Sequence, residues 1–408
     1  MTTIGMAWRN VLRQKRRTLI TLSALIVGLV GLVVFQGYVG QLMRGLRDKT
    51  IRAGIGHIQI SASERYFEDG EYNPFAYVMQ DAAERQALLQ KDPDVLAVFP
   101  STGFTSIAGL GEKSITLLVK GYPIERMYFA PASGSPPVPE DRFGLGTLVS
   151  GALPQAGQRD GIVLGQTAAR ILGAQVGGVI TLMAILPNGG LAGRDFTVCA
   201  IFSSPGMDKN FAYTDFETAR DFTSMDGAPV LHVLLRDITQ TSAVVGRLSP
   251  GAVYRTWRDL ATYYVRANTL LIGFQRVIQL IILLVALFIL ANTMNRIVFE
   301  RTREWGTLRA MGTKKRSIMW LVVLEGCLQG LVGAVIGIGL GFAISALANL
   351  GGGIPYHDGM RLIMVRVKPE LGSILPDLVP VVFTAALAAF FPGLRAIRLT
   401  PAECLRQK

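Results

Sequence analysis

Cysteine and histidine are scarce in this chain of 408 residues, which contains only three of each. They are widely separated, and of the cysteines only Cys199 falls in the large polar segment between residues 41 and 267. That segment therefore has no cysteine pair for an internal disulfide, and none of the spacings is typical of a metal site. We exclude a disulfide-stabilised scaffold and predict no metal. The six residues are Cys199, Cys327, Cys404, His57, His232 and His357.

Motifs that bind nucleotide phosphates or catalyse hydrolysis are also missing. The nearest approach to a phosphate-binding loop is 109–114, where Glu112 separates the second glycine from Lys113. Neither a Gly-x-Ser-x-Gly turn nor a zinc-protease helix occurs. The acidic cluster at 68–71, followed by Tyr72, is typical of a solvated loop. We predict that the chain is not an enzyme and does not itself hydrolyse ATP.

Acidic residues are in short supply in only one part of the chain. The whole sequence has 41 Lys+Arg and 29 Asp+Glu, a net charge of +12. Residues 41–267 contain 21 basic and 22 acidic residues, which leaves 41 − 21 = 20 basic and 29 − 22 = 7 acidic residues elsewhere. The excess of basic residues therefore lies beside the apolar runs. There it favours placement at the cytoplasmic face of the membrane and contact with anionic lipid. No basic patch with interleaved aromatic residues occurs, so we exclude nucleic acid as a partner.

Four long apolar runs dominate the basic part of the chain. Each is long enough to cross a bilayer once its flanks are included. The first is too long for the apolar core of a signal peptide and has no small-residue cleavage site after it. Lys and Arg are concentrated in 1–17, 299–316 and 395–408, so we place these segments and both termini in the cytoplasm. The runs are Leu19–Tyr38, Val277–Ala291, Ile318–Leu347 and Leu375–Leu394.

The predicted fold class is a membrane α-helical protein with four transmembrane helices and a large α+β extracytoplasmic domain between helices 1 and 2. Residues 1–40 form the cytoplasmic N-terminus and helix 1. Residues 41–267 form the outer, periplasmic domain. Residues 268–408 form helices 2–4 and a cytoplasmic tail, with Asn349–Pro369 as a short outer loop and Pro392-Gly393 ending the fourth span.

Two strand–helix–strand patterns mark the ends of the outer domain. The first is 57–60, 81–90 and 95–99, with Asp81 as helix cap. The second is 231–235, 239–248 and 252–256. Between them, about 101–228, lies a β-rich insertion with strands at 114–120 and 161–164, a helix at 166–172, a hairpin of 179–183 with 196–202, and loops at 133–139 and 187–193.

A short basic segment joins the second and third apolar runs. On a helix, Trp305, Leu308 and Met311 fall at i, i+3 and i+6 and share one face, with Arg301 and Glu304 three apart on an adjoining face. We predict an exposed apolar stripe at the cytoplasmic surface. Lipid headgroups or a cytoplasmic protein would cover it.

This segment carries a family resemblance. The run Arg301-x-x-Glu304-x-Gly306-x-Leu308-Arg309-Ala310-x-Gly312, followed by Glu325-Gly326, resembles permeases of the MacB, LolC/LolE and FtsX kind. The stretch 399–406 resembles the closing pattern of that family, with Cys404 in place of alanine, while Trp305 and Thr313 depart from the usual coupling motif. The resemblance implies a coupling helix at about 299–313 that docks into an ATPase. It assigns this role to Arg301, Glu304, Trp305, Gly306, Leu308, Arg309, Met311 and Gly312.

The third apolar run has glycine at every fourth position in two series, which permits close approach of helices. The approach is either fixed packing within the subunit or a contact that rearranges. Glu325 is costly inside a membrane unless it is paired, and the resemblance implies a structural role for it beside the coupling helix. The predicted packing glycines are Gly326, Gly330, Gly333, Gly337 and Gly341.

The resemblance also implies a function. The chain would be a multi-pass permease subunit of an ABC transporter in the bacterial inner membrane, with porter-like parts at about 41–100 and 229–267. A cytoplasmic ATPase dimer would bind ATP and Mg²⁺, and this chain would need no cofactor. It would pair with a second permease chain, identical or homologous. By mechanotransmission it would release a lipoprotein or other amphiphile, with a periplasmic lipoprotein or carrier as a further partner.

Two alternatives remain open at this point. An FtsX-like module would transmit a signal to a cell-wall hydrolase, and a MacB-like protein would export drugs or peptides. An outer domain of about 227 residues favours the MacB and LolC/LolE side, because FtsX-like members have smaller outer domains. The lack of a fused ATPase favours the lipoprotein-releasing branch. No substrate-binding residues are predicted.

Overall fold

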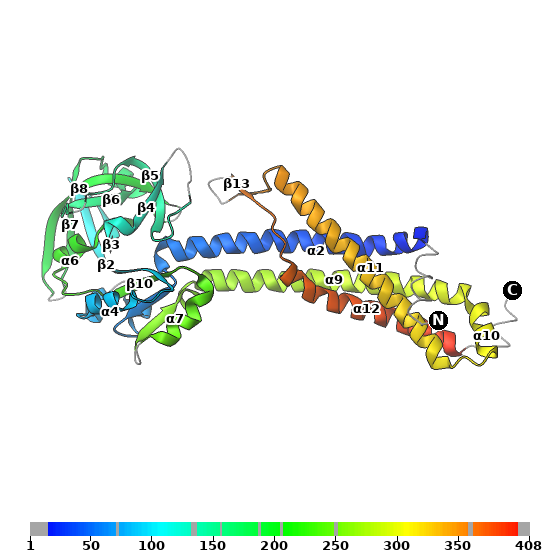
Figure 1. Ribbon diagram of the computed structural model, residues 1–408. Helices are drawn as coiled ribbons and strands as arrows, with labels where there is room; N and C mark the ends of the chain where they lie inside the picture. The colour runs from blue at the N-terminus through cyan, green and yellow to red at the C-terminus, as the bar shows by residue number, and fades with distance from the viewer. Residues whose placement is uncertain are drawn as a thin grey trace. The chain divides into compact units, whose positions relative to one another are not determined.

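The computed structural model describes residues 15–70, 73–131, 137–155, 157–186, 189–204, 207–248, 252–357 and 362–398. The chain divides into two compact units, each described by itself below (Figure 1). The membrane unit is Met1–Gly45 with Ala267–Lys408, and the outer unit is Leu46–Arg266. The predicted cytoplasmic segment 1–14 and the closing motif 399–406 lie outside the described residues.

Four helices of the described chain are long and apolar enough to cross a membrane, which confirms the four predicted spans. The longest has 39 residues, about 58 Å at 1.5 Å per residue, against a hydrocarbon core of about 30 Å. A short helix, α10 (Thr302–Ala310), follows the second span. The four spans are α2 (Lys15–Thr50), α9 (Thr262–Glu300), α11 (Lys315–Leu350) and α12 (Leu371–Arg398).

One prediction about the end of the chain was wrong. The fourth span does not stop at Pro392-Gly393, because α12 contains Pro376, Pro380 and Pro392 and continues to Arg398. Proline is tolerated in membrane helices when neighbouring groups satisfy the freed backbone. The outer loop also contains a hairpin, β12 (Ile354–His357) paired antiparallel with β13 (Leu362–Val365).

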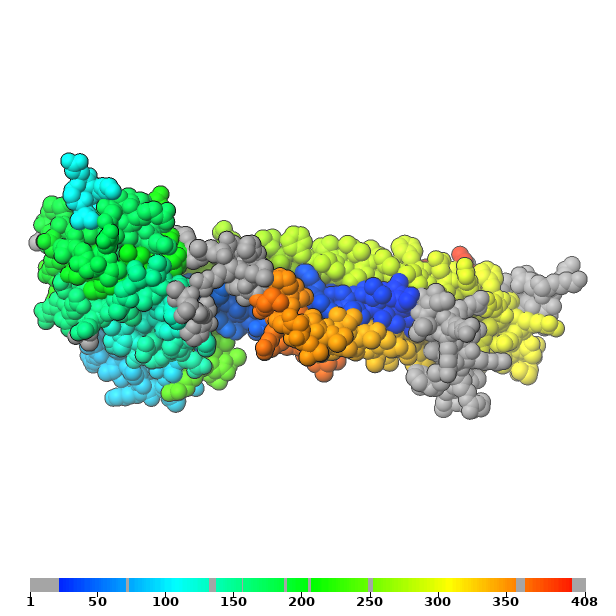
Figure 2. Space-filling model, turned by 90° about the horizontal axis from the view of Figure 1, so that it is seen from above, coloured from blue at the N-terminus to red at the C-terminus, as the bar shows by residue number. Residues whose placement is uncertain are grey.

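The membrane unit packs around a core shared by all four spans. Leu25 and Leu29 of α2, Leu290 of α9, Ala334 of α11 and Ala385 of α12 are buried together. Figures 1 and 2 show α11 lying alongside α2 in this unit. Most of α9 is exposed by comparison, since only 17% of its most apolar window is buried. Lipid or another chain must therefore cover this helix.

The outer unit is built on one sheet of 11 strands in its described part, in the order β11-β1-β10-β2-β3-β9-β6-β8-β5-β4, with β7 pairing β2 and β8. The predicted α+β class is confirmed. The strands are β1 (Ile58–Ser61), β2 (Val95–Leu110), β3 (Lys113–Tyr122), β4 (Met127–Pro131), β5 (Phe143–Gly151), β6 (Gly161–Gly165), β7 (Val179–Ile185), β8 (Leu191–Ser203), β9 (Phe211–Asp215), β10 (Val230–Leu235) and β11 (Val253–Thr256).

The predicted insertion does not have a sheet of its own. Strand β2 is 16 residues long, and its first part pairs with β10 while Thr102–Leu110 pairs with β3. One strand thus links the two strand–helix–strand units to the inserted strands. The predicted hairpin is confirmed, since β7 and β8 pair antiparallel from Val179↔Thr197 to Ile185↔Leu191.

Short helices and turns connect the strands. The helices are α3 (Tyr66–Asp69), α4 (Ala82–Leu89), α5 (Gln166–Leu172), α6 (Phe216–Thr223), α7 (Thr241–Arg247) and α8 (Trp257–Leu260); the turns are η1 (Ile51–Ile55), η2 (Pro74–Tyr77), η3 (Ile124–Arg126) and η4 (Ile238–Gln240). Asp81 lies at the N-cap of α4 but makes no side-chain cap bond. The predicted cap position is therefore correct, but the Asp81 carboxylate accepts a hydrogen bond from Arg85 at 2.7 Å instead of capping the helix. The acidic residues Glu68 and Asp69, predicted in a loop, belong to α3.

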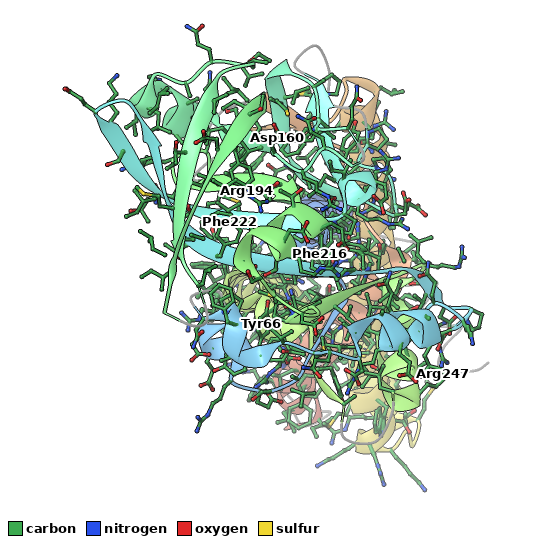
Figure 3. All side chains as sticks on the ribbon, turned by 90° about the vertical axis from the view of Figure 1, so that its left-hand side faces the viewer. Tyr66, Asp160, Arg194, Phe216, Phe222 and Arg247 are labelled. Carbon is green, nitrogen blue, oxygen red and sulfur yellow. The ribbon has the colours of Figure 1, made fainter. Side chains whose placement is uncertain are left out.

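Helix α6 covers one of the apolar cores of the outer unit. Phe222 of α6 packs edge-on against Phe196 of β8, and the Arg194 guanidinium lies 5.7 Å from the Phe222 ring centroid (Figure 3). A second core contains Phe99, Phe143, Phe202 and Tyr213. The sheet is therefore buried by separate apolar clusters, which fix its register.

Candidate coupling site

The coupling segment is a distinct helix between two membrane spans. After α9 ends at Glu300, Arg301 leaves helical geometry with φ −103° and ψ 11°, and α10 runs for nine residues. Gly312 then adopts φ +92°, a conformation that favours glycine. The chain re-enters a helix at Lys315, so α10 is bounded by a break at each end.

Trp305 does not lie on an exposed stripe. It is 3% exposed and packs in a cluster with Met294, Ile297 and Ile318, against which Leu308 is partly buried. The prediction of one exposed apolar face was therefore wrong, because the bundle itself covers Trp305. Of the three residues predicted for the stripe, all of them described in the structure, only Met311 is an exposed large apolar side chain, at 70% exposure.

The exposed face of α10 is mainly polar. It is formed by Arg303, Glu304 and Thr307 and ends at Ala310 and Met311. The neighbouring Gly312 is exposed, Gly306 is buried and Arg309 is half-buried. Exposed basic residues follow at Lys314, Lys315 and Arg316. A partner that binds this face would contact charged side chains and one large apolar side chain.

Arg301 joins α10 to the third span. Its Nε donates to Glu304 at 3.0 Å, and its Nη1 donates to Glu325 at 3.3 Å. Glu325 lies in α11 and is only 4% exposed. A buried carboxylate is strongly disfavoured without a charged or hydrogen-bonded partner. The arrangement is consistent with the anchoring role inferred for Glu325.

The five glycines of α11 face two different helices. A Cβ added at Gly326 or Gly330 would meet Ala389 or Ala385 of α12 at 2.5 and 2.4 Å. A Cβ at Gly333, Gly337 or Gly341 would meet α2 residues Leu25, Leu29 and Val33 at 2.9, 2.9 and 2.7 Å, respectively. Each contact is too close for any side chain. The first two glycines thus pack α11 against α12, and the other three pack it against α2.

A polar cluster that the sequence did not reveal lies at the other end of the bundle. The Asp377 carboxylate in α12 accepts hydrogen bonds from Gln36 Nε2 of α2 at 2.7 Å and Gln279 Nε2 of α9 at 3.0 Å. Gln36 and Gln279 are polar residues within otherwise apolar spans, and this was the sequence signal that could have indicated the cluster. Asp377 links three helices that are far apart in the sequence.

Among the residues that the structure describes, no three His, Cys, Asp or Glu side chains come together as metal ligands. Cys199 and Cys327 are free thiols. Burial raises the pKa of Cys199, against the opposing effect of a hydrogen bond from Gln158. This thiol is therefore less ionised than an ordinary cysteine.

Two protein families match the chain. Residues 18–250 match the MacB-like periplasmic core domain, and residues 276–401 match the C-terminal domain of FtsX-like permeases. The first match alone covers more than half of the chain. The second contains α10 and the last two spans.

Curated relatives include permeases of several bacteria. LolE of Haemophilus influenzae, a lipoprotein-releasing system transmembrane protein, is 24% identical over 99% of both chains. LolC of Neisseria meningitidis serogroup B is 26% identical over 60% of this chain and 64% of its own length. The chain spans only 29% of an uncharacterised ABC transporter permease of Mycobacterium tuberculosis, with 27% identity. Among solved structures, the periplasmic region of MacB from Actinobacillus actinomycetemcomitans covers 52% of this chain and 94% of its own length, with 14% identity and a TM-score of 0.34.

Proposed function

Because the chain belongs to the FtsX/MacB-type ABC transporter permeases with a MacB-like periplasmic core domain, we propose that it couples ATP hydrolysis by a separate cytoplasmic ATPase to movement of its extracytoplasmic domain. ATP and Mg²⁺ are bound by that ATPase. The movement releases a lipoprotein or a similar amphiphile from the outer leaflet of the bacterial inner membrane. Both termini of the permease lie in the cytoplasm.

The observation that carries the proposal is the attachment of α10 to the bundle. Trp305 is buried among residues from three spans, and Arg301 pairs with Glu325 of α11. A force applied to the exposed face of α10 therefore acts on packed helices rather than on a loose loop. Rigid elements of this kind transmit displacement because packed cores resist continuous deformation.

Lipoprotein release is the substrate assignment best supported among the related functions. LolE, named for that system, aligns with the chain over nearly its whole length. The match to the MacB-like core domain over 18–250 disfavours a small FtsX-like signalling module. Export of drugs or peptides, as named for MacB relatives, is the competing assignment.

The assembly that fits this role contains two permease chains and an ATPase dimer. An ATPase dimer offers two equivalent docking sites, and one permease supplies one α10. The exposed apolar residues of α9 provide a surface for lipid or for the second permease.

The docking role is tested by changing Met311, the exposed C-cap residue of α10. The tagged permease is purified from its own membranes together with the ATP-binding cassette protein that accompanies it. Met311→Asp should weaken this association by about thirtyfold, since truncating an interface anchor typically costs about 2 kcal/mol. Leu191→Asp is the matched control, because Leu191 is 73% exposed but lies in the outer unit.

Release is measured in proteoliposomes that contain the purified complex and a fluorescent acylated lipoprotein. ATP-dependent transfer of the lipoprotein to solution is expected for the wild type and for Leu191→Asp. Met311→Asp should lose transfer while still inserting. Undiminished ATPase binding and transfer in Met311→Asp would exclude the docking role. ATP hydrolysis without lipoprotein transfer in the wild type would exclude the proposed substrate.

A further inference from the structure

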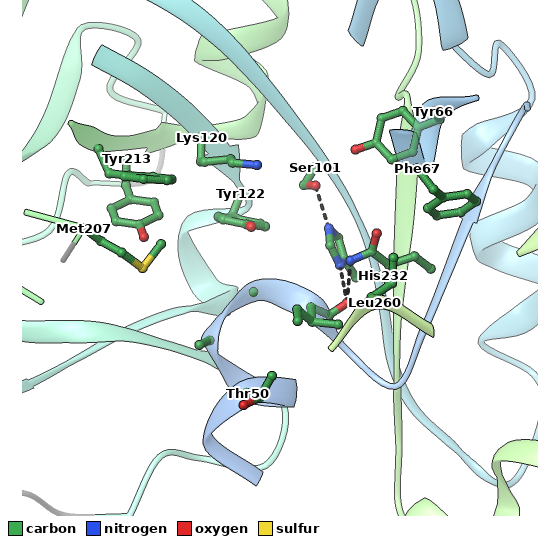
Figure 4. A pocket seen from close by; sticks show the side chains of 15 residues that line it. Thr50, Tyr66, Phe67, Ser101, Lys120, Tyr122, Met207, Tyr213, His232 and Leu260 are labelled. Carbon is green, nitrogen blue, oxygen red and sulfur yellow. Dashed lines mark hydrogen bonds between the residues drawn. The ribbon is translucent and has the colours of Figure 1, made fainter. Parts of the chain in front are cut away.

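The cavities of the two units differ in the polar groups that they offer to a ligand. In the outer unit, a cavity of about 480 Å³ is lined in part by His232, whose ring nitrogens are already hydrogen-bonded to the Ser101 hydroxyl and the Ile55 carbonyl oxygen (Figure 4). The membrane unit contains a smaller cavity, of about 240 Å³. Several polar side chains of this second cavity have no such partner, as described below.

The second cavity lies between α2 and α9, at the end of the bundle where the chain passes to and from the outer unit. Each of the two helices contributes residues three and four apart, which share one helix face. All lining residues except Gln36 lie outside the four apolar runs. The cavity is therefore at the depth of the lipid headgroups of the outer leaflet and not in the hydrocarbon core.

The backbone at Lys368, which lines the cavity, is fixed against α2. Its N–H donates to the Gly37 carbonyl oxygen at 3.3 Å, and the side-chain amide of Asn349 makes two hydrogen bonds of 2.8 Å with the backbone of the preceding Val367. Gly37 permits this approach, since an added Cβ would lie 2.7 Å from the nitrogen of Pro369. The Lys368 side chain thus extends to the cavity from a fixed position.

The lining has an excess of one positive charge. Its charged residues are Arg44, Lys368 and Glu370, so the net charge is 2 − 1 = +1. Arg44 and Glu370 form an ion pair, whereas the Lys368 ammonium makes none with the residues that the structure describes. The Asp377 carboxylate accepts two amide hydrogen bonds and does not line the cavity. An anion is therefore the ligand that complements this lining.

Two amides of α9 add neutral hydrogen-bond donors. Asn268 and Gln275 are seven residues, or about two turns, apart on the cavity side of the helix, and both are half-buried. Neither side chain makes a hydrogen bond within the described part of the chain. Each amide offers two N–H donors, which suit the oxygens of a phosphate. Leu271 and Ile272 lie between them and supply apolar surface.

We propose that this cavity binds the headgroup of an outer-leaflet phospholipid with one net negative charge, of the phosphatidylglycerol type. Its phosphate forms a charge-assisted hydrogen bond with the Lys368 ammonium and accepts from the Asn268 amide. Basic pockets between membrane helices bind anionic headgroups in this way. Because the cavity is smaller than the range of about 300–1,000 Å³ for complete small-molecule sites, the acyl chains lie outside it, on exposed apolar residues of α9 such as Phe274.

Native mass spectrometry of the full-length chain, purified in detergent and freed of lipid, tests the site. Dioleoyl phosphatidylglycerol and dioleoyl phosphatidylcholine have the same acyl chains and are titrated separately, and the first lipid adduct gives each affinity. The wild type should bind phosphatidylglycerol about tenfold more tightly, because the choline group adds a positive charge beside a positive lining. Lys368→Met should lose this preference, and Lys368→Arg should keep it.

Two further variants separate the site from general charge attraction. Asn268→Leu leaves the charge unchanged and should weaken phosphatidylglycerol binding about fivefold, as expected for one neutral hydrogen bond. Arg366→Met is the matched control for Lys368→Met, because Arg366 is exposed in the same segment but does not line the cavity. Its lipid preference should equal that of the wild type.

The proposal is overturned if the wild type binds both lipids equally, if Lys368→Met keeps the preference, or if Asn268→Leu binds like the wild type. Equal losses in Lys368→Met and Arg366→Met would also exclude it, since they would report charge alone. sn-Glycerol 3-phosphate has the phosphate without acyl chains, and its binding as tightly as phosphatidylglycerol would exclude a lipid as the ligand. No ATPase or lipoprotein is present, so the outcome is independent of the function proposed above.

Discussion

Arg301 stands between an exposed and a buried carboxylate, Glu304 and Glu325. Arg301→Met should destabilise the membrane unit by about 3 kcal/mol, because it removes the charged partner of a buried carboxylate. Arg301→Met/Glu325→Met should lose less than the sum of the two single changes, since the double variant buries no unpaired charge. Thermal unfolding followed by alkylation of the half-buried Cys327 measures both effects. Strict additivity would contradict a coupling between the two side chains.

His232 makes the outer unit sensitive to acid. Its pKa is lowered by burial to about 4, from an ordinary value of 6.5. The unfolded chain therefore binds a proton more readily than the folded chain, and stability that is complete above pH 6.5 is lost as the pH falls toward 4. At pH 5 the loss is about 2 kcal/mol.

Hydrogen exchange of β10 in the full-length protein, corrected for the intrinsic effect of pH, measures this loss. His232→Gln keeps a polar side chain but cannot titrate, so its stability should fall less between pH 7 and pH 5. Some dependence of the stability on pH remains in this variant, because burial also lowers the pKa of His57 to about 4. Identical pH dependence in the wild type and His232→Gln would contradict the assignment.

Trp305 shows what periodicity does and does not predict at the level of single residues. The spacing of Trp305, Leu308 and Met311 predicts one shared face, but Trp305 is 3% exposed and Met311, the C-cap residue of α10, is 70% exposed, because spacing alone does not reveal which side the other spans cover. The neighbours that bury Trp305 include Ile318 and Ala389, which come later in the chain. Arg301 and Glu304, placed three residues apart on an adjoining face by the sequence, form an ion pair with an N–O distance of 3.0 Å.

The elements of the outer unit differ in how well their local sequence predicts them. Helix 166–172 was predicted with its observed bounds, since Gly173 ends it at φ +78°. Helix α6 was missed although Asp215 caps it by accepting from the Glu217 amide, an acidic cap signal present in the sequence. Strand β5 contains three glycines, Gly144, Gly146 and Gly151, and its role depends on distant partners in β4 and β8. The sequence of the strand itself does not predict pairing of this kind.

Helix α11 depends on glycine only where another helix touches it. Gly330→Ala should destabilise the membrane unit by about 2 kcal/mol, because its Cβ would lie 2.4 Å from Ala385 Cβ and one helix must shift. Gly339→Ala is the matched control on the same helix, since nothing lies within 4 Å of its added Cβ. Its midpoint of thermal unfolding should not fall, as alanine favours helix over glycine. Equal decreases in both variants would show that helix flexibility, rather than packing, explains the glycines.

At the scale of the whole molecule, composition was sufficient to predict the division of the chain into four membrane spans and one large outer domain. The four apolar runs are the spans, and the nearly neutral 41–267 contains the large sheet. The continuity of that sheet was not predicted, because Pro100 and Gly103, which usually interrupt strands, flank Thr102, where β2 changes partner from β10 to β3.

The orientation of the molecule in the membrane follows from charge and is open to direct measurement. The segment from Arg301 to Arg316 contains six Arg and Lys residues and one acidic residue, Glu304, whereas the outer unit is nearly neutral. Short basic loops remain in the cytoplasm. We therefore expect Glu84, exposed on α4, and Lys315, exposed at the start of α11, to lie on opposite sides of the membrane.

Single cysteines at these positions, introduced after replacement of Cys199, Cys327 and Cys404, test the orientation in intact cells. A membrane-impermeant maleimide should label Glu84→Cys in cells from which the outer membrane has been removed, and should label Lys315→Cys only after lysis. Both positions are exposed in the structure, so a difference in labelling reports the side of the membrane and not burial. Labelling of Lys315→Cys before lysis would place α10 outside the cytoplasm, where no ATPase could reach it, and would exclude the coupling mechanism together with the orientation.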